Sequence, residues 1–274
     1  MSKVNLMPMV KINDINMYYE SHGEGEALIL IAGNGADLSQ WMGIIPLLAK
    51  NYWVIAFDNR DAGRTDKTDV AYSIETMADD TVGLLDALGI GKAHVLGTSM
   101  GGMIAQIIAR KYPGRMKGLV LAGTTMKHSL RNHYAARTAA KRVQDGIDPE
   151  AWANYALAWS FADDIFENPE AVEMIRNGML KMLSSGSVGA FLRQVDAISG
   201  FDSRDWVGSI KAPTLVLAGE DDIAWLRKNS GEALAKAIPG AKFVSLPGGH
   251  VSFLGAPEAF HKHVTEFLTM VDSR

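Results

Sequence analysis

The chain has 274 residues, of which 47% are hydrophobic, and its length suits one large α/β domain or two small ones. Its net charge is −4 without a block of like charges, which argues against a nucleic acid or an anionic membrane as a general partner. The absence of cysteine excludes a disulfide framework and a thiolate metal site.

Strands and helices alternate through the first 123 residues. Short apolar or alternating runs are typical of strands, and glycine, asparagine or aspartate marks the turns between them. Serines stand where two helices of apolar periodicity would begin, at Ser39 and Ser73. The expected strands are residues 10–12, 15–19, 27–32, 52–57, 93–96 and 119–122. The expected helices are residues 39–50, residues 73–88 and one that ends near Tyr112.

From Thr124 to about Ser209 the pattern changes, and no convincing buried strand occurs. Helical segments rich in alanine, methionine and aromatic residues are expected at 131–143, 149–161, 169–183 and 188–198. Alternation then resumes, with strands at 214–218 and 242–246 and helices at 226–238 and from Pro257. This order predicts a mostly parallel, doubly wound sheet with an antiparallel start and a helical lid inserted into it.

The strongest motif lies where the apolar run 93–96 enters the sequence Gly-Thr-Ser-Met-Gly at residues 97–101. Apolar residues then recur at helical spacing. A strand that turns at once into a helix strains the residue at the turn, and the two glycines remove Cβ atoms that would collide there. Ser99 would be exposed at this turn with a helix N-terminus behind it. The pattern resembles the nucleophile elbow of the α/β-hydrolase family.

A serine hydroxyl needs a base within ~2.6–3.2 Å and an acid that orients the base. His250 lies in a glycine-rich turn directly after the strand 242–246, and two aspartates follow the strand 214–218. Both places lie at carboxyl ends of strands, where the sites of open α/β sheets form. The order serine, acid, histidine matches the family's triad, and the family's usual spacing selects Asp222. Asp221 remains the alternative acid.

The other histidines have simpler explanations. His94 lies within the strand 93–96, and His22 lies in a turn. No spacing typical of metal ligands or of a dinucleotide-binding loop occurs, so we expect neither a metal nor a cofactor. The remaining histidines, His128, His133, His261 and His263, are expected on helices.

Two backbone N–H groups would stabilise a developing oxyanion. One belongs to Met100, directly after the nucleophile. The resemblance implies Asn34 as the other donor, because residues 32–35 stand where many relatives read His-Gly-x-Gly. Ala32 replaces the histidine of that pattern, which leaves open how the loop is braced.

The resemblance covers nearly the whole chain and implies an eight-stranded α/β-hydrolase sheet with a helical cap after the sixth strand. We expect residues 1–123 and 210–274 to form the core domain and residues 124–209 to form the cap. The loop 58–66 departs from the family's sequence at Asp61, and we assign it no function.

The resemblance implies a serine hydrolase of carboxylic esters or lactones that forms an acyl-enzyme, with N-acyl homoserine lactones among the candidate substrates. The apolar cap suits an acyl chain or a small aromatic acid. Rival reactions on the same triad are those of cofactor-free perhydrolases (haloperoxidases) and of carbon–carbon bond hydrolases. A ligand-binding protein on a hydrolase scaffold is the non-enzymatic alternative. Expected substrate contacts are Gly33, Met126, Trp159, Trp225 and Phe253.

The expected partner is a small-molecule ester or lactone, with no nucleic acid and no membrane. The N-terminus lacks a long apolar stretch, and no run reaches the ~18 apolar residues of a membrane span. We therefore expect a cytoplasmic protein. For its assembly we expect a monomer or a homodimer.

Overall fold

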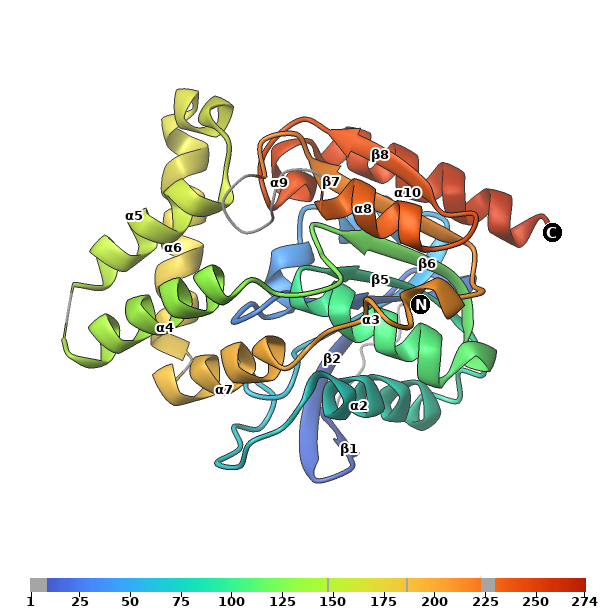
Figure 1. The fold of residues 1–274 in the computed structure, drawn as a ribbon, viewed down its shortest axis with the longest axis horizontal. Helices are drawn as coiled ribbons and strands as arrows, with labels where there is room; N and C mark the ends of the chain where they lie inside the picture. Colours follow the sequence, from blue (N-terminus) through green and yellow to red (C-terminus); the bar gives the residue numbers. More distant parts are fainter. Residues whose placement is uncertain (1–8, 147, 186, 223–229) are drawn as a thin grey trace.

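The structure is a computed structural model that describes residues 9–146, 148–185, 187–222 and 230–274 (Figure 1). One eight-stranded sheet forms its centre, in the order β1-β2-β4-β3-β5-β6-β7-β8. β1 pairs antiparallel with β2 and β2 antiparallel with β4, whereas all other neighbours are parallel. The strands are β1 (Met9–Ile12), β2 (Ile15–His22), β3 (Glu26–Ile31), β4 (Tyr52–Phe57), β5 (Ala93–Thr98), β6 (Met116–Ala122), β7 (Thr214–Gly219) and β8 (Lys242–Leu246).

The three central strands explain where a site can form. β3 lies between β4 and β5, with Leu28 opposite Val54 on one side and His94 on the other. All three are buried along nearly their whole length, as continuous apolar runs of a covered parallel sheet are. Because they run in the same direction, their carboxyl ends lie side by side. The loops after β3, β4 and β5 therefore meet at one edge of the sheet.

Helices cover both faces of this sheet and form two separate apolar cores. One core lies under α2 (Ile74–Ala87), α3 (Met100–Lys111) and α8 (Ser230–Ala237). The other lies under α1 (Ile45–Leu48), the short α9 (Ser252–Gly255) and α10 (Pro257–Asp272). Each fully buried leucine or isoleucine in these cores contributes roughly 1.5–3 kcal/mol to folding. The layered arrangement confirms the predicted doubly wound sheet.

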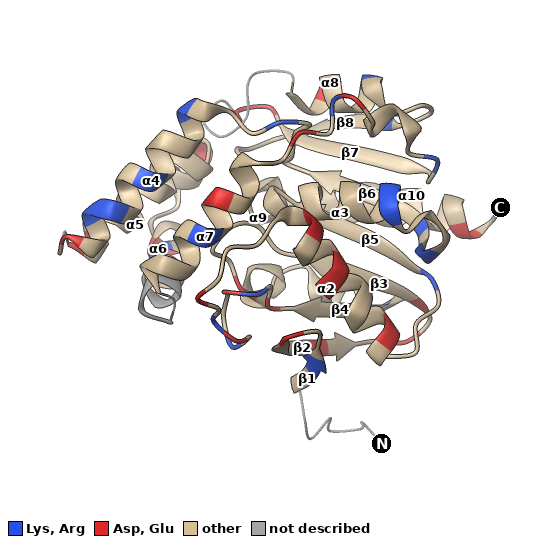
Figure 2. Cartoon of the chain, turned by 60° about the horizontal axis from the view of Figure 1, so that its bottom comes forward, with Lys and Arg blue, Asp and Glu red and all other residues tan. Residues whose placement is uncertain are grey.

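Four further helices lie between β6 and β7 and stand to one side of the sheet (Figure 1). We call them the helical insertion. Basic residues gather along its first helix and acidic residues along α2 of the core (Figure 2). None of the described helices has the length and apolarity that crossing a bilayer requires. The insertion consists of α4 (Leu130–Gln144), α5 (Pro149–Ser160), α6 (Pro169–Ser185) and α7 (Val188–Ser199).

The predicted single helix over residues 39–50 is wrong. A 3₁₀ turn at Leu38–Trp41, capped by the side chain of Asp37, comes first, and α1 begins only at Ile45. Pro46 explains the break, because proline lacks the N–H that a continuing helix needs and its ring clashes with the preceding turn. The predicted helix at 226–238 is described only from Ser230, and the short α9 was not expected.

Candidate active site

Ser99 lies on the sharp turn that joins β5 to α3. Its backbone angles are φ +52° and ψ −117°, a positive-φ conformation that residues with a side chain rarely adopt. A Cβ on Gly97 would lie 2.2 Å from the carbonyl oxygen of Gly101, and one on Gly101 would lie 2.1 Å from that of Ile31. The predicted reason for both glycines is thus confirmed. Met100 is the first residue of α3, where the N–H has no acceptor within the helix.

A chain of two hydrogen bonds joins three distant parts of the sequence. The ring atom Nε2 of His250 lies 3.0 Å from Oγ of Ser99, and Nδ1 lies 2.8 Å from Oδ2 of Asp222. Asp222 is buried, whereas its neighbour Asp221 is exposed and hydrogen-bonds through its backbone N–H to the His250 turn. If Nδ1 carries the proton, Nε2 is free to accept the serine proton.

The loop 33–36 after β3 passes directly beside the nucleophile. A Cβ on Gly33 would lie 3.4 Å from the Cβ of Ser99. The N–H of Ala36 donates to the carbonyl of Gly33 at 3.3 Å, and Gly35 has φ +71°, so the loop is a tight turn. Asn34 therefore lies inside this turn, directly after the glycine that passes beside Ser99.

Side chains from two other parts of the chain brace this loop. The Nδ2 group of Asn59 donates to the carbonyl of Ala32 at 3.2 Å. The N–H of Gly35 donates to Oε1 of Gln194, on α7 of the helical insertion, at 2.7 Å. These contacts answer the question that Ala32 left open. The sequence analysis missed Gln194, although a glutamine within the buried stripe of α7 is a signal that could have found it.

Asp61, to which we assigned no function, ties the loop after β4 to the same helix. Its carboxylate accepts hydrogen bonds from Nε and Nη2 of Arg193 at 2.7 and 3.1 Å. It also accepts from the hydroxyl of Tyr72 at 2.9 Å and from the N–H of Thr68 at 2.7 Å. The hydrogen bonds to Asp61 raise the pKa of Arg193, and burial raises that of Tyr72. This ion pair fixes α7 to the core.

The helical insertion also touches the turn that carries His250. A Cβ on Gly249 would lie 2.8 Å from the carbonyl oxygen of Ser160 and 3.0 Å from the backbone nitrogen of Ala162, at the end of α5. From the other side, a Cβ on Gly219 at the end of β7 would lie 2.1 Å from the carbonyl oxygen of Gly249. The turn is therefore held between the core and the insertion.

The remaining histidines lie outside the triad. The prediction that His128 lies on a helix is wrong, because it lies in the extended stretch before α4. Burial, with smaller effects from His133 and His250, lowers the pKa of His128 to about 4, so its ring is neutral at pH 7. His94 is fully buried in β5. Among the residues that the structure describes, no group of three or more histidine or acidic side chains could hold a metal ion.

The predicted substrate contacts fall into different places. Gly33 lies beside Ser99, as described above. Met126 is half-buried, packs against the core under α3, and accepts a hydrogen bond from the N–H of Ser203. Trp159 is half-buried on α5, with its ring 5.7 Å from that of Tyr155.

Phe253 is a core residue and not a wall of the site. It is 2% exposed, and its ring lies 4.8 Å from that of Trp41 and 5.8 Å from that of Phe260. The short helix α9, which was not expected, turns this side chain into the core, and this explains why the predicted substrate contact is wrong. Trp225 lies outside the described residues.

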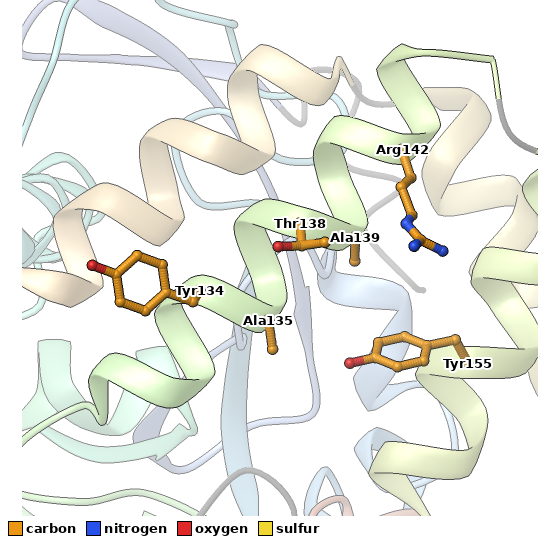
Figure 3. A pocket seen from close by; sticks show the side chains of 6 residues that line it. All are labelled: Tyr134, Ala135, Thr138, Ala139, Arg142 and Tyr155. Carbon is orange, nitrogen blue, oxygen red and sulfur yellow. The ribbon is translucent and has the colours of Figure 1, made fainter.

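A hollow of about 420 Å³ opens between α4 and α5, within the helical insertion. In Figure 3 the rings of Tyr134 and Tyr155 and the guanidinium of Arg142 are drawn around it. None of Ser99, Asp222 and His250 belongs to its lining. The lining residues are Tyr134, Ala135, Thr138, Ala139, Arg142 and Tyr155.

Comparison with known proteins gives consistent matches along the chain. The model of the alpha/beta hydrolase fold matches residues 26–164. The carbamate hydrolase RutD of Azorhizobium caulinodans, whose name marks that activity as provisional, is 29% identical over 97% of this chain and 100% of its own. The 3-oxoadipate enol-lactonase 2 of Acinetobacter baylyi is 30% identical over 92% of each chain.

Solved structures agree with these matches. That of a thermophilic esterase from Thermogutta terrifontis superposes with a TM-score of 0.86 at 31% identity, covering 96% of this chain and 98% of its own. This solved structure therefore has the same fold over nearly the whole chain.

Proposed function

The chain belongs to the alpha/beta hydrolase fold family, and from this premise we propose that it hydrolyses carboxylic esters or lactones on Ser99. The observation that carries the proposal is the hydrogen-bonded line from Ser99 through His250 to Asp222, at 3.0 and 2.8 Å. These distances lie within the range over which a base can take the serine proton. The names of the enol-lactonase and esterase relatives support the same class of substrate.

In the first half of the reaction, His250 takes the proton of the Ser99 hydroxyl while the serine oxygen bonds to the substrate carbonyl carbon. The carbonyl π electrons move to its oxygen, which becomes negative. The backbone N–H groups of Asn34 and Met100 stabilise that charge, and the positive end of α3 adds to the effect. The tetrahedral carbon then releases the alcohol, which takes the proton from His250.

In the second half, water replaces the alcohol. His250 takes one proton from the water as its oxygen bonds to the acyl carbon, and it returns the proton to Ser99 as the acid leaves. Asp222 keeps its charge throughout, because its role is to hold the imidazole tautomer and to stabilise the imidazolium. Its burial strengthens that interaction, since little water competes for the carboxylate.

We further propose that the helical insertion is the cap of this site. Its contacts with the loop 33–36, with the loop after β4 and with the His250 turn support this role. A lid that excludes water strengthens the electrostatic interactions beneath it. The helices bring apolar side chains, which suit the acyl part of an ester or the ring of a lactone.

Labelling by a fluorophosphonate that carries a fluorophore tests the nucleophile. We expect the wild-type protein to be labelled on Ser99 and the Ser99→Ala variant to remain unlabelled, because only an activated serine attacks this phosphorus reagent rapidly. A folded wild-type protein that the reagent does not label would contradict the proposal and favour a ligand-binding protein.

A substrate panel tests the class of bond. We expect turnover of p-nitrophenyl esters of graded acyl length or of lactones, the latter followed by acid release. A carbamate and a hydrogen peroxide assay belong in the same panel. Turnover of the carbamate alone, or peracid formation without ester hydrolysis, would contradict the ester or lactone assignment.

The acid of the triad can be tested with two neighbouring variants. Asp222→Asn should lower kcat/KM roughly 10³- to 10⁴-fold, because the amide favours the wrong imidazole tautomer. Asp221→Asn is the matched control, and its kcat/KM should stay within about 3-fold of wild type, because an exposed side chain is replaced. A larger loss in the Asp221 variant would assign the acid to that residue.

A further inference from the structure

The side chain of Gln194 lies where the helical insertion meets two loops of the core. It is fully buried on α7. Its Oε1 accepts the N–H of Gly35 at 2.7 Å, and its Nε2 donates to the carbonyl of Arg60 at 2.9 Å. Gly35 follows β3 and Arg60 follows β4, so one amide connects both loops at the carboxyl edge of the sheet.

We propose that Gln194 is a positioning residue that aims the N–H of Asn34 at the substrate oxygen; this inference rests on the proposed function. The peptide planes on the two sides of Asn34 share its Cα atom. Gln194 fixes the plane between Asn34 and Gly35 by accepting the N–H of Gly35. The plane between Gly33 and Asn34 is held by the N–H of Ala36, which donates to the carbonyl of Gly33. Glycines flank Asn34, and their backbone is otherwise free to rotate.

The other end of the brace is rigid. Arg60 is 2% exposed, and its guanidinium donates to Asp80 through Nε at 2.5 Å and through Nη2 at 2.9 Å. Nη2 also donates to Asp14 at 2.9 Å. The carbonyl of Arg60 is therefore a fixed acceptor. The amide of Gln194 cannot rotate by half a turn without placing donor against donor and acceptor against acceptor.

The adjacent Arg193 separates positioning from simple attachment. Arg193 anchors the same helix to Asp61 but makes no hydrogen bond or ion pair with the loop 33–36 in the described part of the chain. If α7 acted only by holding the insertion in place, loss of either side chain would have the same effect. Of these two side chains, Gln194 is the one that hydrogen-bonds to the peptide that follows Asn34.

The experiment compares Gln194→Met, Gln194→Glu and Arg193→Met. Methionine matches the length of glutamine without a strong donor or acceptor, and glutamate keeps an acceptor for Gly35. We measure kcat and KM on an ester or lactone that the wild type hydrolyses. We also measure the affinity for a trifluoromethyl ketone of the same acyl group, which forms a tetrahedral adduct with the serine.

For Gln194→Met we expect kcat to fall about 10- to 100-fold, less than the 10²- to 10³-fold loss typical of deleting an oxyanion donor. KM should change less than about 3-fold, and the affinity for the ketone should fall in proportion to kcat/KM. In Gln194→Glu one carboxylate oxygen can accept from Gly35, but the other faces the carbonyl of Arg60, acceptor against acceptor, so its kcat should also fall below that of wild type. Arg193→Met should change kcat less than about 3-fold, even if it lowers stability.

Two outcomes would overturn the inference alone. One is a folded Gln194→Met protein with kcat and ketone affinity within about 2-fold of wild type. The other is an Arg193→Met protein that loses both to the same extent as Gln194→Met. A wild-type protein that is neither labelled by the fluorophosphonate nor active on any panel substrate would instead show that the proposed function, and this inference with it, is wrong.

Discussion

Ser99 is held in a backbone conformation that glycine adopts far more readily. Holding a residue with a side chain in such a conformation costs roughly 1–3 kcal/mol, which the surrounding structure must offset. The close contacts at Gly97 and Gly101 show how tightly β5 and α3 force this turn. Strain at this residue is thus the expected consequence of presenting a hydroxyl at the tip of the turn.

We therefore predict that Ser99→Gly increases the stability of the protein while it abolishes ester hydrolysis. Relative to Ser99→Ala, which retains a Cβ, the free energy of unfolding should be higher by about 1 kcal/mol, since the relief of strain exceeds the entropy that glycine adds to the unfolded chain. Urea denaturation of both variants measures the difference. If the glycine variant were less stable than the alanine variant, the claim that the backbone at Ser99 is strained would be wrong.

At the residue scale, the sequence indicates the groups that belong to a local pattern. Ser99 stands between two glycines, and His250 and Asp222 follow apolar strands, so motif and position identify all three as candidates. Gln194 belongs to no such motif: its place in the buried stripe of α7 could mark it, but not its partners Gly35 and Arg60, which are 159 and 134 residues away. Only the packing of α7 against the core brings them together.

At the scale of elements, α3 lies against β3 at a distance that only glycine permits. A Cβ on Gly101 would meet the carbonyl of Ile31 at 2.1 Å and that of Ala32 at 2.8 Å. These are backbone atoms, which cannot move aside as the end of a side chain can. The approach sets where the N-terminus of α3 sits relative to the loop 33–36.

We predict that Gly101→Ala lowers the free energy of unfolding by about 3 kcal/mol, because overpacking in a rigid contact forces the backbone to shift. Gly114→Ala is the matched control, since a Cβ built there meets no atom from another part of the chain within 4 Å. Its stability should stay within about 0.5 kcal/mol of wild type. Chemical denaturation measures both, and equal effects of the two substitutions would contradict the packing argument.

The element scale also shows where sequence patterns fail. The apolar spacing of residues 39–50 is helical throughout, yet Pro46 divides the segment into a 3₁₀ turn and α1. His128 is expected on a helix, but the chain stays extended until Leu130. Strands β4 and β8, in contrast, match their predicted bounds. In β4 this is because a buried apolar run ends where the polar Asp58 begins.

At the scale of the whole molecule, one hydrogen bond links the centre of the sheet to the end of the chain. Nε2 of His94, in β5, lies 2.9 Å from Oδ1 of Asp272, the last residue of α10. Burial lowers the pKa of His94 below its ordinary value, although Asp272 partly opposes the shift. The folded protein therefore holds this imidazole neutral.

This burial predicts a loss of stability in mild acid. The unfolded chain binds a proton at His94 near the ordinary pKa of ~6.5, whereas the folded protein binds it only at lower pH. The free energy of unfolding should therefore fall as the pH drops below ~6.5. In His94→Gln this fall should be smaller, which urea denaturation between pH 5 and 8 can measure. Parallel pH profiles of the two proteins would exclude His94 as a source.

The tight seam at Gly249 also limits how this protein can be recombined. Backbone atoms of residues 160–162 occupy the space that a side chain at position 249 would need. A chimera that receives the helices of a relative must therefore inherit a compatible path at the end of α5, or the imidazole-bearing turn will be displaced. A chimera that exchanges only the insertion would bring the end of a foreign α5 against the Gly249 turn, where the two backbones need not fit.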